Sequence, residues 1–211
     1  MDSAGDAVAA WTSYGQDGSG AGVYAQRYVE TGHPPTVAGV VVNGGAAQRS
    51  RVTQINVTFS TPVNLAAGAF TLTRVGRPNG QAGDNAAVVA NFTTQLVNGQ
   101  TVATLTFSGT NTTAGSLDDG NWTLTVDHTK VTAVSGGATM AADYTQTGIK
   151  RLFGDVNGDG FVNITDLGAF RAAIGSQAGD GAYDPALDYD GNGFINIADL
   201  GAFRDRIGSS I

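Results

Sequence analysis

The chain of 211 residues contains no cysteine, only two histidines and a single glutamate, Glu30. Without cysteine, disulfide cross-links, thiolate metal ligands and thiol nucleophiles are excluded. The two histidines, His33 and His128, stand alone in the sequence, and we expect His128 to be a polar residue at the end of a strand. The adjacent pair Asp118 and Asp119 lies in a Gly-Asn context that is typical of a turn rather than of an acid–base dyad. Since no nucleophile elbow, phosphate loop or zinc-ligand cluster occurs either, we expect a non-catalytic protein.

Positive charge and long apolar runs are also scarce. The chain has 11 Lys and Arg against 18 Asp and Glu, which gives a formal net charge of -7. This balance indicates no nucleic-acid partner, because nucleic-acid binding depends on clustered basic residues. No segment approaches the ~20 consecutive apolar residues of a membrane-spanning helix. We therefore expect an acidic protein without a membrane span.

Asp, Asn and Gly are concentrated in a twelve-residue segment that occurs twice, at residues 155–166 and 188–199. Oxygen-bearing side chains occupy loop positions one, three, five, nine and twelve of both copies, and glycine occupies position six. A seven-coordinate Ca²⁺ loop requires this order, with the backbone carbonyl of position seven as a further ligand. A chance match twice in the same register is improbable, which disfavours the alternative of two Asx-rich turns without metal. The sequence thus predicts two bound calcium ions.

The spacing also assigns the ligands. Those of the first loop are Asp155, Asn157, Asp159, the carbonyl of Phe161, Asn163 through water, and Asp166. Those of the second loop are Asp188, Asp190, Asn192, the carbonyl of Phe194, Asn196, and Asp199. Each loop carries three carboxylates that repel one another, so we expect the loops to be ordered only with the metal. Asp at position twelve replaces the usual Glu, so the backbone must approach the ion more closely.

Apolar residues follow each loop at steps of three or four. They are Ile164, Leu167, Phe170 and Ile174 after the first loop, and Ile197, Leu200, Phe203 and Ile207 after the second. This spacing predicts one apolar face on each of two short helices, and we expect the two faces to pack together. Asn163 and Asn196 are suited to cap the helix N-termini, and Gly175 and Gly208 are suited to the left-handed residue that ends a helix.

The duplicated loop–helix unit, with Asp at position twelve, no helix before the first loop and Phe-Gly-Asp-Val-Asn-Gly-Asp-Gly at residues 153–160, resembles the dockerin domain over residues 152–211. The resemblance implies an antiparallel helix pair held by two calcium loops, with helix faces that bind a cohesin partner. The near-identity of the two copies implies two similar faces and two binding orientations.

The chain differs from well-known cellulosomal dockerins at the positions that recognise the partner. Their Ser-Thr pair is replaced here by Ile164-Thr165 and Ile197-Ala198, and their basic pair by Arg171-Ala172 and Arg204-Asp205. These differences disfavour a cellulosomal cohesin as the partner. For Arg171 and Arg204, a solvated helix face and a partner contact are equally favoured.

Upstream of the loops, the sequence predicts an all-β region. Six Thr- and Val-rich runs alternate between apolar and polar residues and are separated by Gly, Asn and Asp turns; they cover residues 36–42, 52–59, 69–75, 87–93, 102–107 and 122–126. Asn98-Gly99 is a strong signal for a two-residue hairpin turn. The layout favours an immunoglobulin-like sandwich and resembles the bacterial Ig-like modules that precede dockerins in planctomycete-type surface proteins.

The first 33 residues are expected to form a separate hairpin. Residues 7–14 and 22–29 flank a Gly-rich turn and resemble one repeat unit of the same surface proteins. Two strands that carry Trp11, Tyr14, Tyr24 and Tyr28 cannot cover their own apolar face. They must pack on the sandwich, on neighbouring repeats or on another copy of the chain, and His33-Pro34-Pro35 would act as a stiff linker.

We therefore expect a mainly β protein: a hairpin segment at 1–33, an Ig-like β-sandwich at 34–150 and a small all-α dockerin-type calcium domain at 151–211. The favoured function is a non-catalytic extracellular module that binds a cohesin-like partner at a cell surface or scaffold, where millimolar Ca²⁺ fills the loops. The alternative is a self-assembling filament subunit that donates its N-terminal strands to another copy of itself. A carbohydrate-binding accessory region of a larger enzyme ranks lower.

Overall fold

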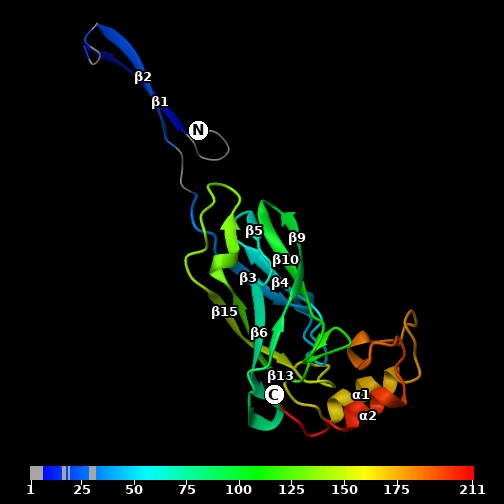
Figure 1. Cartoon of the computed structure of the whole chain (residues 1–211). Helices are drawn as coiled ribbons and strands as arrows, with labels where there is room; N and C mark the ends of the chain where they lie inside the picture. Colours follow the sequence, from blue (N-terminus) through cyan, green and yellow to red (C-terminus); the bar gives the residue numbers. More distant parts are fainter. Residues whose placement is uncertain (1–6, 16–17, 19, 29–31) are drawn as a thin grey trace.

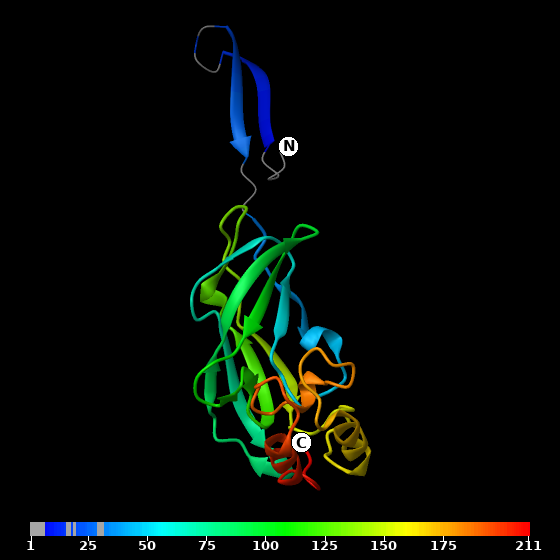
Figure 2. The same cartoon turned by 90° about the vertical axis from the view of Figure 1, so that its right-hand side faces the viewer.

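The computed structural model of the chain describes residues 7–15, 18, 20–28 and 32–211. The protein is mainly β, with two short helices near its C-terminus, as the sequence predicts. Its parts are arranged along one long axis, with a hairpin at one end, stacked sheets in the middle and the helices at the other end (Figures 1 and 2). None of the helices in this described part of the chain is long and apolar enough to cross a membrane.

Two antiparallel sheets form the middle part. The first has the strand order β3-β4-β10-β9, with β3 (Val37–Val42), β4 (Ile55–Phe59), β9 (Asn91–Val97) and β10 (Gln100–Thr106). The second has the order β15-β13-β6-β7, with β6 (Phe70–Arg77), β7 (Gln81–Ala82), β13 (Gly120–Val126) and β15 (Tyr144–Arg151). A further strand, β8 (Ala87–Val89), also pairs with β6.

Short elements connect these strands. Two small strand pairs are formed by β5 (Val63–Leu65) with β14 (Val131–Ala133) and by β11 (Thr112–Thr113) with β12 (Ser116–Leu117). Single 3-10 turns occur at η1 (Asn43–Gly45), η2 (Pro78–Gly80), η3 (His128–Lys130) and η4 (Pro185–Leu187).

The sandwich core lies between the two sheets. Along β13 the buried side chains alternate with half-buried ones, so that Trp122 and Leu124 point inward, as strand geometry requires. Phe70 of the second sheet contacts Phe92 of the first, with ring centroids 5.2 Å apart. Burial of such apolar side chains from both sheets stabilises the sandwich.

One of the strand predictions needs correction, and one long strand lies outside the predicted runs. The run 87–93 is not one strand: β8 pairs with β6 in the second sheet, and β9 pairs with β10 in the first. The chain passes between the sheets at the buried Ala90, which periodicity alone cannot show. The strand β15 was not predicted, because its sequence is rich in polar residues and contains Gly148 at a φ of 75°.

Both predicted hairpins are present. Asn98 and Gly99 have φ values of 51° and 79° and join β9 to β10 through a two-residue turn. At the N-terminus, β1 (Ala7–Tyr14) pairs with β2 (Ala21–Tyr28), while residue 29 of the predicted strand lies outside the described residues. The β1–β2 hairpin projects away from the sandwich (Figures 1 and 2).

The C-terminal part contains α1 (Ile164–Ala173) and α2 (Ile197–Arg204). Phe170 and Phe203 are buried between the helices, with ring centroids 5.1 Å apart, as predicted. Four residues of the predicted faces are instead exposed: Ile164 and Ile197, at 76% each, and Ile174 and Ile207, which lie beyond the helix ends. An α-helix turns about 100° per residue, so two successive steps of three residues turn about 600°, which is about 120° short of two full turns. Ile164 therefore lies about 120° from Phe170 around the helix axis.

Candidate metal centre

In the first loop, backbone N–H groups donate hydrogen bonds to two buried carboxylates. Asp155, at position one, accepts hydrogen bonds from the N–H groups of Gly158 and Gly160 at 2.7 and 3.0 Å. Asp166, at position twelve and in the first turn of α1, accepts from the N–H groups of Val156 and Asn163, both at 3.0 Å. The loop therefore wraps around its own acidic side chains.

The second loop repeats this network position by position. Asp188 accepts from the N–H groups of Gly191 and Gly193 at 2.8 and 2.9 Å. Asp199 accepts from Tyr189 and Asn196, both at 2.8 Å. The sequence repeat is therefore also a structural repeat.

Side-chain oxygens at the other polar positions are held in the same way. Each accepts from the N–H group two residues further along the chain, at 2.8 to 3.1 Å; the acceptors are Asn157, Asp159, Asn163, Asp190, Asn192 and Asn196. Glycines at loop positions four and six, Gly158 and Gly160 in the first loop, have φ values of 77° and 87°, a region that side chains disfavour. Every residue predicted to bind the metal through its side chain thus has a side-chain oxygen that is oriented by backbone N–H groups of its own loop.

The protein compensates the charge in these loops only in part, since Arg51 lies close enough to Asp188 to help lower its pKa. Asp155, Asp166, Asp188 and Asp199 are all buried. Among the residues that the structure describes, none of these four carboxylates forms a salt bridge with Lys or Arg. Burying an unpaired carboxylate is strongly unfavourable, and a cation bound among all-oxygen donors removes that cost. The donor set therefore fits a hard divalent cation.

The two loops are not identical electrostatically. Carboxylate oxygens of Asp188, Asp190 and Asp199 lie within 4.8 Å of one another, and the three acidic residues of the first loop do not form such a group. Burial, with repulsion from Asp166 and Asp159, raises the pKa of Asp155. The pKa of Asp188 is lowered: burial acts to raise it, but hydrogen bonds from the Tyr183 hydroxyl, at 2.7 Å, and from backbone N–H groups outweigh that effect.

Both helix N-termini, and the C-terminus of α1, agree with the sequence prediction. Asn163 and Asn196 cap the N-termini of α1 and α2 through their side-chain oxygens. Gly175 follows the C-cap of α1 with a φ of 88°, as predicted. Gly208 also has a positive φ, 84°, but α2 already ends at Arg204, so Gly208 does not end this helix as predicted. On the outer surface, α1 and α2 expose Ile164 and Ile197 together with Arg171 and Arg204.

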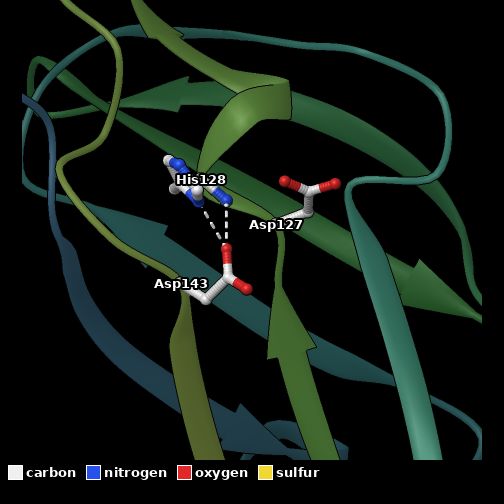
Figure 3. A group of neighbouring side chains, drawn as sticks. All are labelled: Asp127, His128 and Asp143. Atoms are coloured by element: carbon white, nitrogen blue, oxygen red, sulfur yellow. Dashed lines mark hydrogen bonds and ion pairs between the residues drawn. The ribbon is translucent and has the colours of Figure 1, made fainter.

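His128 lies just after β13, at a strand end as predicted, but it does not stand alone. Its Nδ1 atom is 2.6 Å from Oδ1 of Asp143, and its backbone N–H donates to the same oxygen at 2.9 Å (Figure 3). Asp127, beside it, caps η3 by accepting from the N–H of Thr129 at 2.9 Å. The backbone N–H and then the ring of His128 lower the pKa of Asp143. These bonds connect the end of β13 to the start of β15.

Asp119 has a role that the sequence did not reveal. It lies in a bend, as expected, but its carboxylate also accepts from Arg151 Nη1 at 2.5 Å, Phe153 N–H at 2.8 Å and Arg206 Nε at 2.6 Å. The partners come from the end of the sandwich and from the C-terminal part, which no local motif could indicate. Glu30 lies outside the described residues.

Comparison with known proteins identifies only the C-terminal part. No curated protein and no solved structure matches the chain. The family model of the dockerin type I domain matches residues 153–207, which include both loops and both helices. The match supports a dockerin domain here, and with it a calcium-dependent, non-catalytic module of protein–protein interaction.

Proposed function

We propose that the chain is an extracellular assembly module in which a dockerin domain at 151–211 binds a cohesin-like protein. An Ig-like sandwich at 34–150 carries it, and the segment 1–33 forms a separate hairpin unit. The observation that supports this function best is the set of four buried carboxylates, two in each loop, none of which forms a salt bridge with Lys or Arg among the described residues.

The proposed metal content is two calcium ions. Their ligands are Asp155, Asn157, Asp159, Phe161, Asn163 and Asp166 in the first loop, and Asp188, Asp190, Asn192, Phe194, Asn196 and Asp199 in the second. Calcium suits these sites because every donor is an oxygen and the loops supply the six or more donors that it prefers. When bound, calcium neutralises the carboxylates and holds each loop against the helix that follows it. Loops of this kind are filled wherever free Ca²⁺ is millimolar, which favours an extracellular location.

The proposed partner surface lies on the outer faces of α1 and α2. Ile164 and Ile197 stand at equivalent positions and are equally exposed, at 76% each. Arg171 and Arg204 are also exposed at equivalent positions. Apolar side chains flanked by arginine are typical anchors of protein interfaces. Since the two faces repeat one another, a partner can bind in either of two orientations.

This proposal is tested by measuring binding of the purified chain to immobilised cohesin domains. Binding should require Ca²⁺ and disappear in chelator. The double variant Ile164→Asp/Ile197→Asp should abolish binding, while each single variant retains one usable face. Val134→Asp places the same charge on another exposed β-branched apolar residue, in the sandwich and 59% exposed, and should leave binding unchanged. Binding that persists in chelator, or in the double variant, would refute the proposed surface.

A second candidate function is self-assembly, in which the N-terminal hairpin of one copy adds its strands to another. It is favoured by the position of the hairpin, which projects away from its own sandwich (Figure 1). Val8, Tyr14 and Val23 are 67%, 85% and 80% exposed. Exposed apolar strands of this kind are suited to pairing with a second chain.

A further inference from the structure

A three-residue segment of the sandwich, residues 49–51, reaches the first residue of both calcium loops. The N–H of Arg49 donates to the carbonyl oxygen of Asp155 at 2.9 Å. Nη1 of Arg51 donates to the carbonyl oxygen of Asp188 at 2.6 Å. Position one of each loop is therefore fixed through its backbone, while its carboxylate remains directed into the loop.

Ser50, between these two arginines, connects the segments that lead into the loops. Its side chain is buried, and its hydroxyl donates to the carbonyl oxygen of Ala186 at 2.6 Å, two residues before the second loop. The same hydroxyl accepts from the N–H of Gly154 at 2.8 Å, one residue before the first loop. One buried hydroxyl thus joins the two halves of the repeat.

The loops also touch the sandwich at their position-four glycines. A Cβ atom on Gly158 would lie 1.9 Å from the carbonyl oxygen of Ala47. A Cβ atom on Gly191 would lie 2.8 Å from Cβ of Ala114, a residue whose carbonyl also accepts from Nη2 of Arg51. A side chain therefore has no room at either glycine, and the backbone of each loop packs directly against the sandwich at this position.

We propose that residues 49–51 form a clamp that positions both calcium loops and couples the two sites to each other and to the sandwich. The inference rests on the proposed calcium sites, and it assigns Ser50 and Arg51 as positioning residues outside the ligand set. If calcium strengthens the clamp contacts, linkage requires those contacts to strengthen calcium binding by the same factor. The sandwich should then melt at a higher temperature with calcium than in chelator.

The most direct test is calcium titration calorimetry on Ser50→Ala at a temperature where the chain is fully folded. The variant should still bind two ions, each about tenfold more weakly, the size expected of a typical coupling between sites. Thr101→Val is the matched control, because its buried hydroxyl accepts from the N–H of Val63 at 2.9 Å entirely within the sandwich. Thr101→Val should melt at a lower temperature but bind calcium as the unmodified chain does.

A second variant keeps the test decisive if Ser50→Ala does not fold. Arg51→Lys retains the charge but cannot span the carbonyls of Asp188 and Ala114 together. In the background of Asp166→Ala, where only the second site remains, Arg51→Lys should weaken calcium binding about tenfold. In the background of Asp199→Ala, where only the first site remains, Arg51→Lys should leave calcium affinity unchanged.

Unchanged calcium affinity in Ser50→Ala or in Arg51→Lys would overturn the clamp, whatever the melting temperature. If the unmodified chain binds no calcium, the calcium assignment itself fails, and the clamp fails with it. Two ions bound with wild-type affinity in the variants would leave the calcium sites standing and remove only the clamp.

Discussion

At the scale of single residues, the aspartates at loop positions one and twelve determine how the C-terminal part responds to metal. Asp155, Asp166, Asp188 and Asp199 are buried and bonded to backbone N–H groups, which orient their oxygens but bring no full positive charge. An uncompensated buried carboxylate costs several kcal/mol even after relaxation of the protein. Metal binding and the folding of each loop should therefore occur together.

Replacing one position-twelve aspartate should remove one calcium site. Asp166→Ala or Asp199→Ala deletes the carboxylate that joins its loop to the following helix, so titration calorimetry should count one ion per chain instead of two. Asp118→Ala is the control, because Asp118 accepts from Thr113 Oγ1 within the sandwich, and it should retain two sites. Two intact sites in Asp166→Ala would contradict the assignment of the first loop.

Acid stability of the sandwich should depend on Asp84. Arg74 donates to its carboxylate from Nε and Nη2 at 2.9 and 2.6 Å, and this hydrogen bonding lowers the pKa of Asp84 below its usual 3.8. Because the pKa of Asp84 is lower in the folded chain than in the unfolded chain, the pair stabilises the fold fully at pH values above the unfolded pKa. This stabilisation is lost as the pH falls from the unfolded pKa through the folded pKa.

Asp84→Asn should therefore show a smaller loss of stability than the parent chain between about pH 6 and about pH 3. The measurement is the urea midpoint in chelator at both pH values, with the exposed Asp205→Asn as a control that behaves like the parent. An equal pH dependence in Asp84→Asn and the parent would show that this pair does not act on acid stability.

At the scale of elements, the two helices are too short to be stable alone. α1 has 10 residues and α2 has 8, whereas isolated helices below about 12 residues are marginal in water. Gly168 and Gly201 lie inside them and cost about 1 kcal/mol each relative to alanine. The contact of Phe170 with Phe203 and the bound loops must compensate for this.

Removing calcium should therefore reduce the helical content. The far-ultraviolet circular dichroism of the chain should lose helix signal in chelator and recover it when calcium is added back. The matched measurement is the same titration on Asp166→Ala/Asp199→Ala, in which chelator should change little because the sites are already lost. An unchanged helix signal after confirmed metal removal would mean that the helices fold without calcium.

Local spacing predicted the loops, the capping residues Asn163 and Asn196 and the alternating strands, because each depends on residues that are close in the chain. It did not predict that the chain changes sheets at Ala90, because both strands alternate in the same way. The three-way contact of Asp119 joins residues more than thirty positions apart. Such contacts depend on the tertiary fold and leave no local signature.

At the scale of the whole molecule, the hairpin and the dockerin domain lie at opposite ends of the sandwich (Figures 1 and 2). This separation lets one end bind a partner while the other remains accessible. It also makes the two proposed modes of assembly experimentally separable, because each depends on a different end of the chain.

Deleting the hairpin tests the self-assembly mode. A chain that starts at Pro35 should keep the melting temperature of its sandwich, because the hairpin projects away from it, and should lose any self-association seen by light scattering. The variant Tyr14→Ser, which changes one exposed aromatic residue, should reduce association without affecting folding. Unchanged association in the truncated chain would exclude strand donation, and a large drop in melting temperature would instead indicate packing in cis.

Counting the calcium bound to the purified chain shows whether the C-terminal repeat is loaded with metal, on which its proposed role as an interaction module depends. Equilibrium dialysis against millimolar calcium, followed by elemental analysis, should give two ions per chain. The double variant Asp166→Ala/Asp199→Ala should give none. A parent chain that binds no calcium under these conditions would show that the two loops are not calcium sites.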